Sequence, residues 1–157
     1  MHRIYENNDI TVFWDSSKCR HAKKCVYGSP QTFDISRKPW IDVTIAPTAE
    51  IWQTVSECPS GALTCVYNHE ISVKLDTDAC KSIAYDGDRQ IGECDYQVTS
   101  DGWNIYHTEV MPEYGGKGIA KRLVYKIVEA AEKTGVDVIP TCSYAESCLV
   151  THFKIIS

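Results

Sequence analysis

Apolar residues recur with two different periods along the chain, and these periods predict its strands and helices. Short alternating or continuous apolar runs predict strands, which we place at 10–14, 64–67, 80–85, 91–98, 103–110 and 136–139. Apolar residues spaced three and four apart predict helices at 49–55 and 119–133. The longer helix has the stronger pattern, because one face carries Ala120, Leu123, Val124, Ile127, Val128 and Ala131.

The two halves of the chain are organised differently. Clustered cysteines and one short helix precede a shift in composition near residues 67–75. After the shift, the order is strand, strand, strand, helix, strand. We therefore predict an α+β protein of two domains, 1–70 and 71–157, the second a mixed sheet with one long helix.

Charge and hydropathy exclude several classes of partner. A net charge of −5 argues against nucleic acid as the main partner, because phosphate binding requires a basic surface. The sequence contains no apolar run long enough to predict a transmembrane helix. Residues 1–8 also lack the apolar core of a signal peptide. We therefore expect a cytoplasmic protein that does not use a membrane.

Eight cysteines are many for a chain expected in a reducing compartment, where disulfides are rare. Metal or redox chemistry therefore becomes the more natural explanation. Cys19, Cys25, Cys58 and Cys65 lie in the first half, together with His21. For most of the remaining cysteines, Cys80, Cys94, Cys142 and Cys148, we expect the role of plain core thiols.

Three glycines within four residues, Gly115, Gly116 and Gly118, lie between a predicted strand and the long helix. Glycine allows backbone N–H groups to converge on an anion, and the helix N-terminus adds N–H groups and a favourable dipole. Lys117 and Lys121 add positive charge. The segment predicts a phosphate or pyrophosphate site, although a simple connecting turn would use the same glycines.

The residues around this loop resemble the acetyl-CoA motif of the GNAT acetyltransferases: Val110-x-Pro112-x-Tyr114-x-Gly116-Lys117-Gly118-Ile119-Ala120-x-x-Leu123. The resemblance implies that the strand ending at Val110 pairs with the pantetheine arm and that the loop holds the pyrophosphate. The implied cofactor-binding residues are Val110, Gly115, Gly116, Lys117, Gly118, Ile119, Ala120 and Lys121. Gly115 departs from the family, which usually has Arg or Gln there.

Three further blocks, 94–96, 105–110 and 139–144, resemble the minimal GNAT-like proteins, which keep little beyond the CoA-binding core. This resemblance implies acetyl-CoA as the cofactor. It also implies an amine acceptor, either a small molecule or a protein.

Acetyl transfer from a thioester needs a deprotonated amine, support for the oxyanion and a proton for the departing thiolate. Cys142 precedes an expected helix start, a position that favours a thiolate nucleophile, and the resemblance makes it the candidate acetyl carrier. Tyr144 would protonate the leaving thiolate, and His107 would act as general base. Alternatively, Cys142 is a structural thiol and Tyr144 is a packing aromatic. His107 would then be a core histidine that shares a strand face with Ile105.

The first half contains Cys19-x-x-Ala22-x-x-Cys25 followed by Cys58-Pro59. Bacterial ferredoxins hold iron–sulfur clusters with a Cys-x-x-Cys-x-x-Cys run and a remote Cys-Pro. Residues 10–67 therefore resemble single-cluster ferredoxins, and in particular a divergent single-cluster family with an Arg-Pro-Trp-like block, here residues 37–41.

Three thiolates, from Cys19, Cys25 and Cys58, suit a 3Fe–4S cluster. A 4Fe–4S cluster needs a fourth ligand, for which His21 and Cys65 are the local candidates. Zinc is the competing metal, but its paired ligands are usually two to four residues apart, and five residues separate Cys19 from Cys25.

These features favour a GNAT-like N-acetyltransferase that binds acetyl-CoA and carries an iron–sulfur domain with a redox-sensing or structural role. The alternative is an electron-transfer or redox-sensing protein that meets a redox partner and whose CoA-binding domain is regulatory. A metal-stabilised scaffold without catalysis is a third hypothesis.

Overall fold

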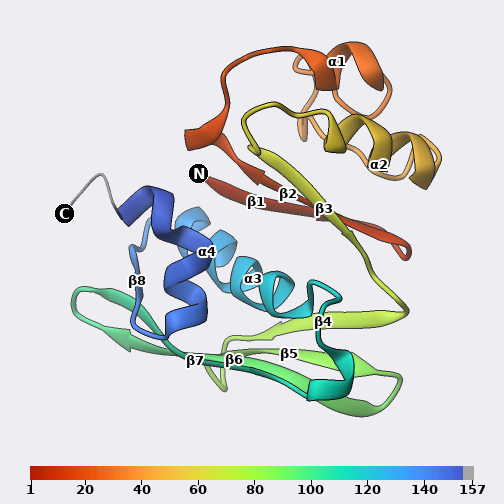
Figure 1. Ribbon diagram of the computed structural model, residues 1–157. Coiled ribbons are helices and arrows are strands. Elements are labelled where there is room, and N and C mark those ends of the chain that lie inside the picture. Colours follow the sequence, from red (N-terminus) through yellow and green to blue (C-terminus); the bar gives the residue numbers. More distant parts are fainter. Residues whose placement is uncertain (154–157) are drawn as a thin grey trace. The chain divides into compact units, whose positions relative to one another are not determined.

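The computed structural model describes residues 1–153, and the chain divides into two compact units, Met1–His69 and a second that begins at Glu70 (Figure 1). The first unit contains β1 (His2–Glu6), β2 (Ile10–Asp15), the 3-10 turn η1 (Ser16–Lys18), α1 (Lys24–Gly28), α2 (Thr48–Ser56) and β3 (Leu63–Tyr67). The second contains β4 (Ile71–Asp76), β5 (Lys81–Asp86), β6 (Arg89–Thr99), β7 (Gly102–Val110), η2 (Pro112–Tyr114), α3 (Ile119–Lys133), β8 (Val138–Pro140) and α4 (Ser143–Phe153).

The sheet of the first unit is antiparallel, in the order β1-β2-β3. Every residue of the central strand β2 is buried, as a continuous apolar run predicts for a strand covered on both faces. Helix α2 buries Ile51 and Val55 in the same core. Trp52 of α2 also stacks on Tyr67 of β3, with ring centroids 4.3 Å apart. This small core supports the long segment between α1 and α2.

That segment has almost no regular secondary structure, but a single arginine braces it. The Arg37 guanidinium donates to the carbonyl oxygens of Gln31 at 3.0 Å, Thr32 at 2.9 Å and Trp40 at 3.3 Å. Trp40 in turn packs edge-on against Trp14 of β2, with ring centroids 5.0 Å apart. The block of residues 37–41 therefore fixes the loop to the sheet.

The sheet of the second unit has the order β4-β5-β6-β7-β8. Its neighbouring strands are antiparallel except β7 and β8, which are parallel and joined through α3. The apolar face of α3 forms the core of this unit together with residues of the sheet and of α4. The buried residues of α3 include Leu123, Val124, Ile127 and Val128.

The predicted α+β class is confirmed, and α3 has the predicted bounds of 119–133. The structure adds β1 and β4, which the sequence prediction omitted. Four antiparallel strands, rather than three, therefore precede α3 in the second unit. Both strands alternate buried residues with more exposed ones, and their runs are only five and six residues long, so the period-2 signal is short.

A β-bulge interrupts the pairing of β6 with β7. Asp95 is opposite His107, whereas Tyr96 is opposite Ile105, so Tyr106 is an extra residue in β7. Ile105 is buried, while Tyr106 and His107 are exposed. The expectation that His107 shares a face with Ile105 is therefore wrong, because the extra residue reverses the alternation.

Gly102, at the start of β7, should tolerate no side chain. Its φ is +146°, and an added Cβ would lie 2.3 Å from the Asp137 carbonyl oxygen, which also accepts the Trp103 N–H at 2.8 Å. We expect Gly102→Ala to destabilise the protein by about 2–4 kcal/mol, from backbone strain plus overpacking. Urea denaturation measures the shift in midpoint.

Gly87→Ala is the matched control for this substitution. Gly87 also has a positive φ, +62°, but an added Cβ would meet nothing within 4 Å. We expect it to cost only about 1 kcal/mol. Equal midpoints for the two variants would contradict the proposed clash at Asp137.

Candidate functional site

Three of the four cysteines in the first unit line one hollow of about 900 Å³. They are Cys19, Cys25 and Cys58, and His21 lines the same hollow. Cys65 does not line it; this residue lies in β3, where it pairs with Val12 of β2. The structure thus places around one hollow the three thiols and the histidine that the sequence analysis named as candidate cluster ligands.

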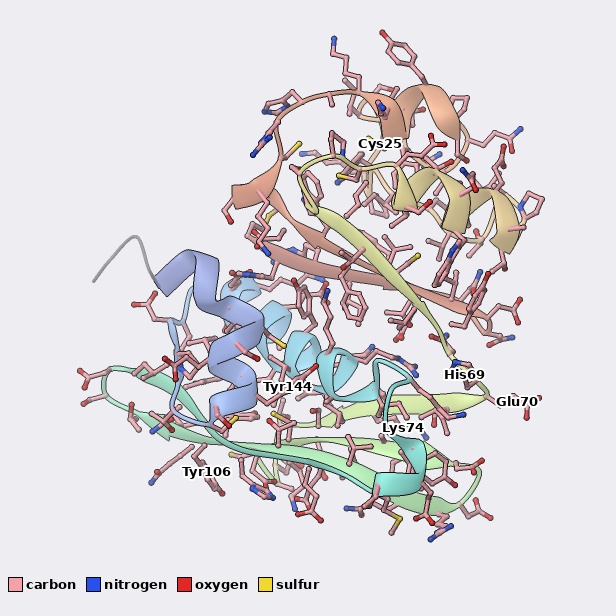
Figure 2. All side chains as sticks on the ribbon, in the orientation of Figure 1. Cys25, His69, Glu70, Lys74, Tyr106 and Tyr144 are labelled. Atoms are coloured by element: carbon pink, nitrogen blue, oxygen red, sulfur yellow. The ribbon has the colours of Figure 1, made fainter. Side chains whose placement is uncertain are left out.

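Local backbone geometry turns these residues toward the hollow. Cys19 follows η1, and its sulfur accepts the backbone N–H of His21 at 3.4 Å. His21 and Lys23 have left-handed φ values of +55° and +63°, so the chain turns sharply before α1, which carries Cys25 (Figure 2). Cys58 follows α2 and donates its N–H to the Val55 carbonyl at 3.0 Å.

The thiols of Cys25 and Cys58 differ electrostatically. Burial raises the pKa of the Cys25 thiol. Backbone N–H groups act to lower this pKa and the charges of Cys58 and Cys19 act to raise it, so that the net shift is upward. Burial also acts to raise the pKa of Cys58, but the backbone N–H groups of residues 60, 62 and 63 and the Ser60 hydroxyl outweigh it, so that pKa is lowered. The turn after α2 therefore stabilises a thiolate, the form that binds metal.

The donor set fits an iron–sulfur cluster. The irons of a cluster are held by separate cysteines arranged around an inorganic core, and three thiols around one hollow match that arrangement. Within residues 1–153, no three His, Cys, Asp or Glu side chains converge on a position for one metal ion. Backbone N–H groups also donate to the sulfurs of Cys19 and Cys58, and such hydrogen bonds are expected around sulfurs that bind iron as thiolates.

The glycine loop of the second unit lies between η2 and α3. Gly116 and Gly118 have φ values of +77° and +73°, and Gly118 is the N-cap residue of α3, which has no side-chain cap. Within residues 1–153, no hydrogen bond engages the N–H groups of residues 116–118. The Gly115 N–H instead donates to the Pro112 carbonyl at 3.1 Å. The loop thus presents backbone donors at a helix N-terminus, with Lys117 and Lys121 half-buried beside them.

The two parallel strands, β7 and β8, separate after Ile105. β8 pairs with β7 only over Trp103–Ile105, and the Ile105 carbonyl then accepts the N–H groups of Thr141 at 2.9 Å and Cys142 at 3.2 Å. Beyond that point, β7 continues to Val110 with only β6 hydrogen-bonded beside it among the described strands. One edge of β7 is therefore available to an extended ligand that runs toward the glycine loop.

Cys142 lies between β8 and α4, at the N-terminus of that helix. Its sulfur accepts the backbone N–H of Ala145 at 3.3 Å and lies 3.3 Å from the Thr108 hydroxyl. That hydroxyl is also 3.3 Å from the sulfur of Cys94. Burial raises the pKa of Cys94 to about 12, so Cys94 remains a neutral thiol.

Thr108 was not singled out from the sequence, because its partnership with Cys142 depends on the bulge at Tyr106. The only signal was its place in the block of residues 105–110 and its position opposite Cys94 in a predicted strand pair.

The structure does not bring His107 to Cys142. The exposed His107 ring lies 3.0 Å from the Glu109 carboxylate, on the face of β7 opposite to Thr108. Tyr144 is closer along the chain, in the first turn of α4, and its side chain is 37% exposed. Burial raises the pKa of the Tyr144 phenol, and Cys148 beside it adds to that rise.

Comparison with known proteins gives the class of each unit. Residues 5–68 match the family described as a divergent 4Fe-4S mono-cluster, and residues 82–155 match the GCN5-related N-acetyl-transferase family. The chain therefore belongs to the divergent mono-cluster 4Fe-4S family and continues into a GCN5-related acetyltransferase-like domain, as predicted.

Two curated relatives come from Escherichia coli. Each is the "Uncharacterized protein YjdI", one from strain K12 and one from O157:H7. Each is 35% identical over 69 residues, which make up 44% of this chain and 88% of the relative. Among the described helices, none is both long and apolar enough to cross a membrane.

Proposed function

We propose that the protein is an acetyl-CoA-dependent N-acetyltransferase whose first unit carries an iron–sulfur cluster. The observation that supports the transferase is the continuous path from the open edge of β7, through the glycine loop, to the uncapped start of α3. An extended chain with an anionic end fits such a path, because the strand edge pairs with amides and the helix N-terminus binds phosphate.

The pantetheine arm and the pyrophosphate of acetyl-CoA each have a counterpart on this path. The edge of β7 that ends at Val110 would pair with the pantetheine amides. The N–H groups of Gly116, Lys117 and Gly118, with those of Ile119 and Ala120 in the first turn of α3, would hold the pyrophosphate. The Lys121 ammonium adds charge there. Gly115 would shape the turn, since its own N–H is bonded to Pro112.

Cys142 is the proposed acetyl carrier. Its thiolate would attack the thioester carbonyl, forming a new carbon–sulfur bond as the bond to the CoA sulfur breaks. Tyr144 would supply the proton to the CoA thiolate. An acceptor amine would then take the acetyl group, releasing the Cys142 thiolate and returning the amine proton to the Tyr144 phenolate. The Ala145 N–H and the Thr108 hydroxyl contact the sulfur and hold it in position. His107 has no part in this scheme, because it faces the other side of the sheet.

In the first unit, Cys19, Cys25 and Cys58 would hold the cluster. A 4Fe–4S cluster requires a fourth ligand, and we assign His21 rather than Cys65, because only His21 lines the hollow. Such a cluster supplies a reversible one-electron centre. Its role toward the second unit would be redox sensing or structural support.

The decisive experiment is calorimetric titration of acetyl-CoA into anaerobically purified protein with measured iron and visible absorbance. We expect one acetyl-CoA per chain, and iron in the stoichiometry of one cluster. Absence of binding heat at several temperatures would overturn the CoA site. A colourless protein that contains zinc instead of iron would overturn the cluster.

Gly118→Ala tests the backbone cradle. The φ of Gly118 is +73°, and an alanine there costs about 1–2 kcal/mol or shifts the backbone out of that conformation. We expect acetyl-CoA affinity to fall about tenfold, which corresponds to 1.4 kcal/mol, as measured by calorimetry.

Gly135→Ala is the matched control, because Gly135 has a φ of +75° with open space around it and lies just beyond the opposite end of α3. We expect it to destabilise the helix similarly and to leave affinity unchanged. Equal affinity losses in both variants would show that the loop amides do not bind the ligand.

The cysteine hollow favours a second candidate function, an electron-transfer or redox-sensing protein whose CoA-binding unit is regulatory. Reversible cluster reduction without acetyl transfer to any amine would favour this function. Turnover that survives removal of the cluster would favour the transferase.

A further inference from the structure

The charges of the first unit are strongly segregated. Residues 1–69 contain seven Lys and Arg and seven Asp and Glu. Six of the basic residues line the hollow that holds the three thiols, and among the described residues no acidic one lines it. These six residues, which we call the basic rim, are Arg3, Arg20, Lys23, Lys24, Arg37 and Lys38.

Two strongly exposed apolar side chains, Tyr27 and Ile35, lie among the basic rim, together with the less exposed Met1. Tyr27 of α1 is 77% exposed and Ile35 is 75% exposed, and both line the hollow. Large exposed apolar side chains surrounded by polar ones are typical of protein interfaces, in which aromatic anchors contribute much of the binding energy. Figure 2 shows α1 with Cys25 labelled, two residues before Tyr27.

The rest of the chain is acidic. With a net charge of −5 for the whole protein and none for residues 1–69, the excess negative charge lies beyond residue 69. A long polyanion such as nucleic acid requires an extended basic surface. A compact acidic protein that covers only the hollow needs no more than the basic rim. Weak electron-transfer complexes use small interfaces of this kind, and complementary charge speeds their association.

We propose that the basic rim docks an acidic one-electron carrier protein over the cysteine hollow. This inference rests on the proposed cluster. One electron passes between the reduced carrier and the oxidised cluster, so that the carrier is oxidised and the cluster reduced by one electron. No covalent bond forms or breaks, and no proton moves. Tyr27 and Ile35 supply the apolar contact, and the rim supplies the attraction.

The test uses the full chain with its cluster, verified by iron content and visible absorbance. An acidic plant-type [2Fe–2S] ferredoxin is the probe, and stopped-flow absorbance gives the second-order rate of electron exchange. Reduced probe is mixed with oxidised protein, and oxidised probe with reduced protein. Electron transfer is then thermodynamically favourable in one of the two experiments. We expect the rate to fall about tenfold from low salt to ~0.5 M NaCl, because salt screens attraction between exposed charges.

Lys24→Glu should lower the low-salt rate about tenfold and flatten its salt dependence. Lys23→Glu is a second variant, in case the first does not retain the cluster. The matched control is Lys74→Glu, which makes the same charge change at an exposed residue of β4, outside the hollow (Figure 2). We expect the control to retain the wild-type rate within about twofold.

A rate that does not depend on salt, or equal rates for Lys24→Glu and Lys74→Glu, would overturn the docking proposal. Tight binding of a DNA or RNA oligonucleotide that Lys24→Glu abolishes, with no change in exchange with ferredoxin, would also overturn it in favour of a nucleic-acid surface. Wild-type protein without iron would instead mean that the proposed cluster has failed.

Discussion

Cys58→Ser should leave anaerobically purified protein nearly colourless and remove most of its iron. The substitution removes the thiolate whose pKa is lowered by surrounding N–H groups, which makes it the best-prepared ligand in the hollow. A serine oxygen is a poorer ligand for the soft, thiolate-bound irons of a cluster. Visible absorbance and iron analysis on matched preparations measure the loss.

Cys65→Ser is the control for this loss. Cys65 is partly buried in the same unit but lies in β3, outside the hollow. We expect it to retain wild-type colour and iron. If Cys65→Ser loses the cluster and Cys58→Ser keeps it, the ligand set drawn from the hollow is wrong. A cluster retained in Cys58→Ser alone would contradict the role of that thiolate.

Cys142→Ala should abolish acetyl transfer while leaving acetyl-CoA affinity unchanged. The alanine removes the sulfur that the Ala145 N–H and the Thr108 hydroxyl contact, but it alters neither the edge of β7 nor the glycine loop. We expect turnover to fall on the order of 10³-fold, as for loss of a covalent nucleophile. Chromatography of acetylated amine measures transfer, and calorimetry measures affinity.

Cys148→Ala is the thiol control in the helix that follows Cys142. This residue lies in α4 six positions beyond Cys142, and we expect near-normal turnover. Mass spectrometry of intact wild-type protein should also detect an acetyl adduct that the Cys142→Ala variant lacks. Unchanged turnover in Cys142→Ala would reduce Cys142 to a packing residue and leave direct transfer to the amine as the mechanism.

Local patterns predicted the parts of the structure that depend on neighbouring residues. The bounds of α3 followed from its apolar stripe, since burial of one helix face imposes a period that sequence displays directly. The Cys19, Cys25 and Cys58 set followed from metal-ligand spacing, and the structure places all three around one hollow. The roles assigned to these residues and to Cys142 remain predictions.

Features that depend on distant residues were not predictable. The bulge at Tyr106 arises from pairing with β6, and it moves His107 away from Cys142. The basic rim combines residues from β1, the cysteine loop and the braced segment around Arg37, and no window of sequence contains all three. Cys65 is near Cys58 in sequence, but β3 carries it out of the hollow. Each of these results is decided by tertiary structure rather than by local propensity.

Tyr106 has no partner in β6, so the side-chain alternation along β7 changes phase at this residue. Upstream of it, odd-numbered Ile105 faces the core; downstream, even-numbered Thr108 and Val110 do so. If Tyr106 were instead paired with Asp95 in a regular ladder, every later residue of the strand would shift by one position. The imidazole and carboxylate of His107 and Glu109 would then face the core, and the hydroxyl of Thr108 would face solvent. One residue without a strand partner thus decides which chemistry this strand directs toward Cys142.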